Sequence, residues 1–374
     1  MKKSLLALAA LGMFAGAAHA QSTVTLYGIV DIGILYTNNA NAAGKSAWQM
    51  ASGNESGSRW GLTGAEDLGG GTKAIFKLEN GFNPNNGTLG QGGREFGRQA
   101  YVGLSNKSFG TFTLGRQYNA VQDYLAPLDV ASTLTQYATH PYDNDNLNNT
   151  FRTDNSVKYV SPTIGGFQAE GLYGFSNSTG FANNRSYSVG ATYGMGPLNV
   201  AAAYAYVQNP NVAGGAVSGT IPAVRVQQWG LGATYAFGPA TIGLLYTGSL
   251  YSNFVGAPAT ATTAAIPGTT AIANRAGGTI HFNNYEGSFR FQLTPALVLA
   301  VGETYTGVRQ AGVSGHFWQT NLGADYNLSK RTDVYLTGIY QHATNNMNAA
   351  IDASAGTASG RAQTAVVAGI RHKF

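Results

Sequence analysis

Residues 24–34, VTLYGIVDIGI, alternate between apolar side chains and polar or small ones. The apolar positions are Val24, Leu26, Val30, Ile32 and Ile34, and the intervening positions include Thr25, Tyr27 and Asp31. Because successive side chains of a β-strand point to opposite faces, this stretch predicts a strand with one apolar and one polar face. The same two-residue period recurs in residues 72–80, 241–250 and 361–374.

The composition is unusual for a soluble enzyme. The 374 residues include 51 Gly, no Cys and 10% charged side chains, whereas soluble domains average roughly 7% Gly and 25% charged residues. The lack of Cys excludes disulfides, thiolate metal sites and cysteine nucleophiles. The formal charge is +5, but the 22 Lys and Arg residues are scattered along the chain. They form no basic stripe of the kind that binds phosphates, so we expect no nucleic-acid partner.

The first twenty residues have the layout of a secretory signal peptide. Lys2 and Lys3 precede the apolar run Leu5–Ala15, and the small-residue ending Ala18–Ala20 follows. This pattern predicts cleavage before Gln21, which leaves residues 21–374 as a single domain. The apolar run is too short to cross roughly 30 Å of hydrocarbon as an anchor.

The connections between the predicted strands alternate in length. Seven are short and centre on residues 67–70, 106–108, 162–165, 194–197, 238–239, 294–295 and 328–331. Eight are longer and rich in Asn, Gly, Ala, Ser and Thr, namely 37–57, 83–96, 119–155, 175–185, 209–223, 251–277, 307–313 and 342–360. Fifteen connections join sixteen strands. An even strand count with turns at one end and loops at the other is typical of an outer-membrane barrel.

These observations predict an all-β fold, a 16-stranded antiparallel transmembrane β-barrel with short periplasmic turns and long external loops. At membrane depth every backbone N–H and C=O must be paired internally, which a closed barrel achieves. Sixteen strands enclose more space than side chains fill, so we expect an aqueous channel. A secreted β-sandwich or lectin array is the alternative, since its strands also alternate between apolar and polar side chains.

Several ordered segments resemble one known family. They are VTLYG at 24–28, SRWGLTGAEDLGGG at 58–71, GRQAYVGL at 97–104, FGT at 109–111, LGRQY at 114–118 and the terminal Phe374. The chain is similar to the trimeric general porins of Gram-negative outer membranes, in their β-proteobacterial branch. The resemblance implies a homotrimer embedded in outer-membrane lipid. It also implies an inward-folded third external loop, residues 119–155, that constricts the pore, and an assembly signal at Phe374.

Three arginines lie where the first three long loops lead into the next segments: Arg59 and Arg98 open the segments after the first two loops, and Arg152 lies just before the segment after the third. Arg59, Arg98 and Arg152 therefore lie near the external ends of strands that run in the same direction, at similar heights. Alternation turns Arg59 and Arg152 inward and leaves Arg98 undecided. The resemblance implies that all three line the pore wall at the constriction, and Lys77 shares the inward face of its own segment.

The third loop is expected to supply carboxylates opposite these arginines. Asp123 and Asp129 keep the spacing of the family's loop after residues 115–118, so the resemblance implies that they face the basic wall. The family's Pro-Glu-Phe-Gly-Gly motif is missing, and residues 130–133 take its place. A constriction short of one carboxylate would be net positive and would prefer anions weakly. We interpret Asp143 and Asp145 as solvated loop acids, not as a cation site.

The sequence motifs bear on the class of function. The chain has no His-Glu-x-x-His pair and no Gly-x-Ser-x-Gly elbow, so we expect no enzyme, no cofactor and no metal site. The predicted function is passive diffusion of small hydrophilic solutes and ions. Two alternatives remain, a substrate-specific outer-membrane channel and a barrel that serves mainly as a surface adhesin or receptor.

Overall fold

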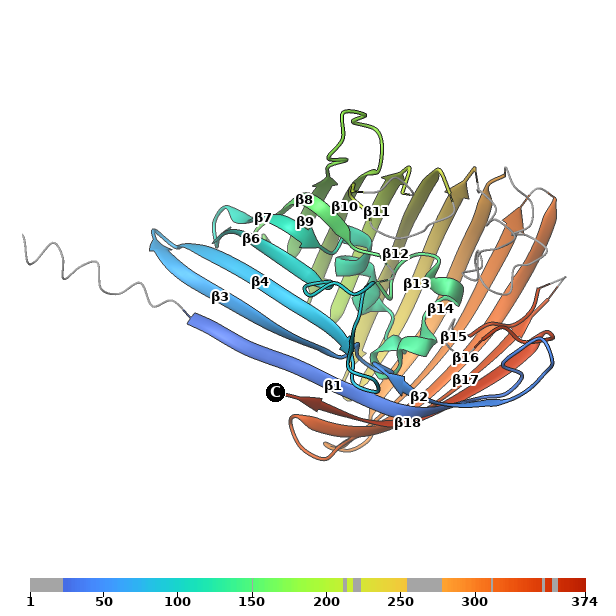
Figure 1. Ribbon diagram of the computed structural model, residues 1–374. Coiled ribbons are helices and arrows are strands. Elements are labelled where there is room, and N and C mark those ends of the chain that lie inside the picture. The colour runs from blue at the N-terminus through green and yellow to red at the C-terminus, as the bar shows by residue number, and fades with distance from the viewer. Residues whose placement is uncertain are drawn as a thin grey trace, which may run out of the picture.

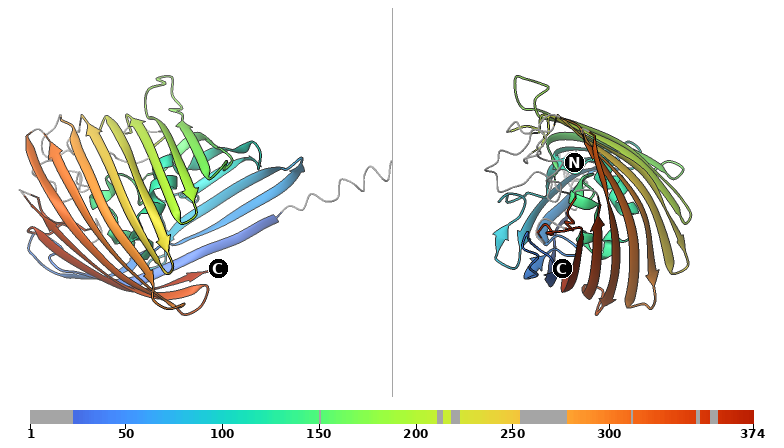
Figure 2. Two further views of the ribbon diagram at one scale, coloured as in Figure 1. Left: turned by 180° about the vertical axis from the view of Figure 1, so that it is seen from behind. Right: turned by 90° about the vertical axis from the view of Figure 1, so that its right-hand side faces the viewer.

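The chain folds as one antiparallel sheet that closes on itself (Figures 1 and 2). The computed structural model describes residues 23–149, 151–210, 214–217, 223–253, 278–310, 312–344, 347–351 and 356–374. The predicted signal peptide lies outside these residues. No helix in the described part of the chain is long and apolar enough to cross a membrane.

The wall of the barrel has sixteen strand positions. They are filled by β1 (Thr23–Thr37), β3 (Arg59–Gly69), β4 (Thr72–Asn83), β6 (Gln99–Asn106), β7 (Gly110–Gln117), β8 (Thr153–Val160), β9 (Phe167–Gly174), β10 (Arg185–Met195), β11 (Leu198–Gln208), β12 (Arg225–Phe237), β13 (Ala240–Ser252), β14 (Ile280–Gln292), β15 (Leu297–Gln310), β16 (Val313–Asn327), β17 (Thr332–Ala343) and β18 (Ala362–Lys373). The barrel closes because β1 pairs with both β3 and β18. The predicted 16-stranded antiparallel barrel is confirmed.

Two further strands do not add to this count. β2 (Ala47–Ser52) continues the line of β3 beside the second half of β1, so the two share one position in the wall. β5 (Thr88–Leu89) pairs with the end of β4.

The connections follow the predicted alternation with one exception. The seven short turns all join strands at one end of the barrel. The loop expected at 307–313 is wrong, because β15 and β16 leave only residues 311 and 312 between them. The strand alternation of β15 continues to Gln310. Gly312 has a φ of +83°, a left-handed backbone conformation that favours glycine and allows so tight a turn.

The third long loop runs through the interior of the barrel (Figure 1). Residues 118–152 contain the short helical turns η1 (Val121–Leu125), η2 (Ala126–Leu128), η3 (Ser132–Leu134), η4 (Gln136–Ala138) and η5 (Pro141–Asp143). Apolar loop side chains pack against Ala201, Ala203 and Ala205 on the inner face of β11. The loop is therefore held to the wall by apolar burial, which small wall residues permit.

A track of inward glycines lies beneath this loop. A Cβ atom on Gly230 would come within 2.7 Å of Leu125 Cδ1, and one on Gly323 would meet Leu134 Cβ at 3.0 Å. The remaining members of the track are Gly190, Gly232, Gly243 and Gly302. Part of the high glycine content thus makes room for the loop along β10 to β16, because side chains there would displace it.

Candidate functional site

The structure brings the three predicted arginines together around Tyr118, the residue after β7. Arg98 donates from Nη2 to the Tyr118 hydroxyl at 3.1 Å, and the Arg152 guanidinium lies 5.2 Å from the centre of the Tyr118 ring. Arg59 interacts electrostatically with Arg98 and with Tyr118. Three cations from three separate segments therefore form one basic cluster on the inner wall. Arg98, whose orientation alternation left undecided, faces inward with the other two.

Glu79 on β4 is the carboxylate of this cluster. It accepts from Arg98 Nε at 2.8 Å, and Lys77 Nζ lies 3.5 Å away. The Tyr27 hydroxyl donates to its other oxygen at 2.7 Å. We had not predicted a role for Glu79, although it shares the inward face of β4 with Lys77. The two-residue alternation of β4, which turns both side chains inward, is the sequence signal that identifies Glu79 as a wall residue.

Asp123 lies at the edge of the same region and is paired with a different cation. Lys158 on β8 bonds to the Asp123 carboxylate, and its Nζ is 3.3 Å from Glu170 on β9. The same Nζ donates to the carbonyl of Tyr118 at 3.3 Å. The wall around Tyr118 therefore holds five basic side chains, Arg59, Lys77, Arg98, Arg152 and Lys158, against the three carboxylates Glu79, Asp123 and Glu170. The charge of this set is net positive.

Arg152 differs from Arg98 in having no carboxylate partner among the described residues. Its Nη1 donates to the carbonyl of Asn149 at 3.1 Å, and its Nε has no hydrogen-bond partner in the part of the chain that the structure describes. Burial lowers the pKa of Arg152 to about 10. The nearby charge of Arg98 also lowers this pKa, whereas Tyr118 raises it. Arg152 is therefore charged at neutral pH. Together with Arg98 and Asn148 it lines a polar cavity of about 200 Å³ between the loop and the wall.

Asp129 lies elsewhere than expected. Its side chain is 1% exposed beneath the loop, so it presents no charge to the lumen opposite the arginines. It accepts from the backbone N–H of Ser132 at 2.9 Å. Burial raises the pKa of Asp129 well above its usual value, and the nearby Glu286 carboxylate raises it further. The loop path places this carboxyl against β14, which sequence spacing could not show.

His140 joins the loop to the wall through two carboxylates. Its Nδ1 is 2.5 Å from Asp145 of the loop, and its Nε2 is 3.2 Å from Glu286 of β14. Asp145 also accepts from the Thr247 hydroxyl of β13. The interpretation of Asp145 as a solvated acid is wrong, because it is 1% exposed. We call His140, Asp145, Glu286 and Asp129 the loop anchor.

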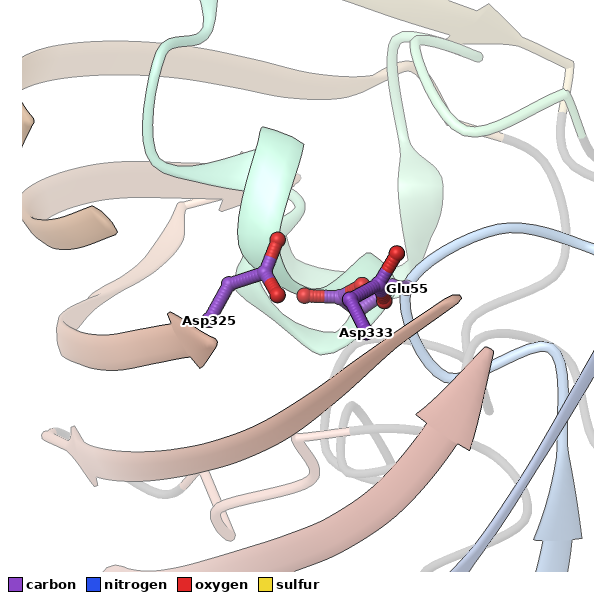
Figure 3. A group of neighbouring side chains, drawn as sticks. All are labelled: Glu55, Asp325 and Asp333. Carbon is purple, nitrogen blue, oxygen red and sulfur yellow. The ribbon is translucent and has the colours of Figure 1, made fainter. Parts of the chain in front are cut away.

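A second charged group joins the segment between β2 and β3 to the wall beside the turn between β16 and β17. Glu55, Asp325 and Asp333 approach one another closely enough to suggest a metal site (Figure 3). Arg371 on β18 is 3.0 Å from Glu55, 3.5 Å from Asp325 and 3.0 Å from Asp333. The guanidinium is thus the cation that the three carboxylates share, and we assign no metal to them.

Arg116, near the end of β7, belongs to neither group. It pairs with Asp154 at the start of β8, and Arg94 is 3.0 Å from the same carboxylate. This cluster ties the second external loop to β7 and β8.

Comparison with known proteins agrees with this architecture. A model of the Gram-negative porin family matches residues 7–348. An outer membrane porin of Bordetella pertussis is 42% identical over 59% of this chain, and the chain covers 63% of that relative's length. Outer membrane porin protein 32 of Delftia acidovorans is 32% identical over the full length of both chains.

A solved structure gives the same fold. The anion-selective porin from Comamonas acidovorans superposes with a TM-score of 0.74 at 27% identity, over 95% of this chain and all of that one. A closed barrel of sixteen strands, an inward third loop and a family match across most of the sequence agree with one another. The chain belongs to the Gram-negative porin family of outer-membrane channels, which are not enzymes.

Proposed function

We propose that this protein is a general diffusion porin with a weak preference for anions. The observation that carries the proposal is the cluster around Tyr118, where five cations face three carboxylates. Charged walls of low dielectric constant focus the field in a narrow channel and raise the local concentration of counter-ions. Asp129, buried in the loop anchor, does not offset that field. The similar porin from Comamonas acidovorans is described as anion-selective, which supports a preference for anions over cations here.

Planar bilayers test this proposal directly. We expect the purified protein to insert in ohmic steps and, under a KCl gradient, to give a reversal potential of the sign for chloride preference. The preference should weaken with ionic strength, because the Debye length falls from roughly 10 Å at 0.1 M to 3 Å at 1 M. A clear potassium preference would contradict the assignment of the basic cluster to the pore wall.

The two alternatives predict other results in the same apparatus. A substrate-specific channel would show saturable block of the ion current by its solute. A barrel acting mainly as an adhesin or receptor would leave the bilayer electrically silent. The charge cluster favours the diffusion pore, because it lies inside the barrel, on the wall and on the inward-folded third loop.

Export and assembly complete the proposal. Cleavage before Gln21 would leave a mature barrel chain that assembles as a homotrimer in outer-membrane lipid, as the sequence resemblance implies. We expect the first residue of the protein isolated from outer membranes to be Gln21. Small hydrophilic solutes and ions are the expected cargo.

Phe374 is proposed as the assembly signal, and its contacts close the barrel. Its backbone N–H donates to Gly28 O at 3.1 Å and its carbonyl accepts from Gly28 N at 3.0 Å. Its ring lies so close to Gly28 that a Cβ there would come within 2.3 Å of Cζ. Deleting Phe374 should lower the yield of folded protein in the outer membrane several-fold, measured by the heat-modifiable band in gels. Phe109→Ala, in an exposed turn, is the control and should assemble normally.

A further inference from the structure

Glu303 lies in an unexpected place, on the outward face of β15. The strand alternates regularly, and Glu303 shares its exposed face with Leu299 and Val301. It is six residues from Leu297 and seven from Gln310, in the middle of the strand. This face of a membrane barrel meets lipid, where an ionisable side chain is costly and points to a function.

An aromatic row borders Glu303 on its external side. Tyr246, Tyr285, Tyr305 and Trp318 are paired, each with the next, across β13 to β16. Successive ring centres are 5.1, 6.2 and 4.9 Å apart. Tyr285 is 54% exposed and Trp318 is 45% exposed, so parts of these rings remain uncovered. The negative ring faces of Tyr and Trp attract cations.

A hollow accompanies the carboxylate. Gly287 is paired with Glu303 on the neighbouring strand, and of the described atoms a Cβ there would meet only Leu244 Cδ2, at 3.9 Å. The groove at this position has a volume of about 520 Å³ and is lined by Leu231, Leu244, Tyr285, Gly287, Glu303 and Trp318. On the other side the Thr320 hydroxyl donates to Glu303 Oε2 at 2.6 Å and orients the carboxylate.

We propose that Glu303, the aromatic row and this groove form a lipid-facing site for a lipophilic amine, an alkylammonium ion dissolved in the membrane. The carboxylate provides the counter-charge, the rings contact the cationic head, and the groove receives the alkyl chain. A neutral lipid chain would fill the groove and leave the carboxylate without a counter-charge. The volume suits a small molecule, whereas a stable protein partner needs roughly 800 Å² of surface on each side.

A hydrophobic carbodiimide provides a site-resolved test on the intact porin in neutral liposomes. Dicyclohexylcarbodiimide partitions into the bilayer and should label Glu303, with peptide mass spectrometry as the readout and Glu303→Gln as the unlabelled reference. Dodecyltrimethylammonium should protect Glu303 at concentrations at least tenfold lower than dodecanol, which has the same chain without the charge. Protection by both at equal concentration, or no labelling of Glu303, would overturn the proposal.

Gly287→Leu is the variant that separates the groove from the carboxylate. The new side chain has room, so Glu303 should still be labelled while protection by dodecyltrimethylammonium weakens at least tenfold. Glu66, outward on β3 near a periplasmic turn, is the internal control whose labelling should not respond to the amine.

The conductance of Gly287→Leu and Glu303→Gln should match the wild type, because both positions face away from the lumen. If either variant loses the native oligomer, the wall is a subunit contact and the amine site is rejected.

Discussion

Replacing Arg152 by Ser is expected to shift the reversal potential toward cations by the largest amount of any single charge in the cluster. Its guanidinium contacts the Tyr118 ring and the carbonyl of Asn149, and no described carboxylate neutralises it. Replacing Arg98 instead would also leave Glu79 without its main partner. The Arg152 variant therefore changes the charge of the lumen with the least disturbance of its structure.

The expected size of this shift follows from Coulomb's law. A unit charge about 10 Å from a permeating ion contributes roughly 0.4 to 1.7 kcal/mol for dielectric constants between 80 and 20. The same charge attracts chloride and repels potassium, so the two energies add in the permeability ratio. The chloride-to-potassium ratio should therefore fall about four-fold at the higher dielectric constant and by more at the lower one, and further in the double variant with Arg59→Ser. Because the pKa of Arg152 is about 10, the difference between wild type and variant should shrink as pH rises past that value.

Arg331→Ser is the matched control for the selectivity measurement. Arg331 is exposed in the turn between β16 and β17, away from the basic cluster. Its removal changes the net charge by the same amount and should leave the reversal potential nearly unchanged. Equal shifts in the two variants would mean that overall charge, and not the wall around Tyr118, sets the preference.

Replacing His140 by Ala is expected to release the third loop from the wall. Asp145 and Glu286 would then remain buried without the cation between them. Removing one partner from a buried ion pair typically costs about 3–5 kcal/mol. The backbone hydrogen bonds of the sheet are untouched, so the barrel itself should stay folded. Chymotrypsin should cleave the loop at Tyr137 or Tyr142 at least tenfold faster, and single-channel currents should become noisier.

The pKa shifts of the loop anchor give its pH dependence. Burial alone would lower the pKa of His140, but Asp145 and Glu286 outweigh it and raise that pKa well above its usual value. The stabilising charge of His140 is therefore lost as pH rises through the raised value. Deprotonation of Asp129, whose pKa is also raised, weakens the anchor in the same direction.

Acid weakens the anchor through Asp145 instead. Burial raises the pKa of this carboxyl, but His140 and Thr247 outweigh burial and lower it, so its contribution is lost as pH falls through the lowered value. Loop cleavage should thus be slowest near neutral pH and should accelerate in alkali. His372→Ala, at an exposed position on β18, should behave as the wild type. An equally fast cleavage of both variants would show that His140 does not hold the loop.

The basic wall could be predicted in part from the sequence. Parity placed Arg59 and Lys77 inside, and the position of Arg152 after a long loop placed it near the external end. Alternation along a strand does not determine which inward side chains contact one another. Those contacts depend on the stagger between strands and on the curvature of the barrel wall. Glu79 therefore went unnoticed, although it shares the inward face of β4 with Lys77.

The third loop shows the limit more sharply. Residues 118–152 have no two-residue period, so nothing local determines which loop carboxylate reaches which wall strand. Asp129 was expected to face the pore, and it lies beneath the loop near Glu286, a residue more than 150 positions later in the chain. Asp145 resembles any solvated loop acid until β13 and β14 are placed against it.

The sequence by itself determined the strands, their number and the closed antiparallel sheet, because side-chain alternation is local and unpaired backbone groups are too costly in lipid. Tertiary structure alone decided the path of the loop through the lumen, the partners of its acids and the pairing of charges around Tyr118. Those features arise from contacts between segments far apart in the chain. Their geometry follows from the curvature and stagger of a closed wall, which no short stretch of sequence encodes.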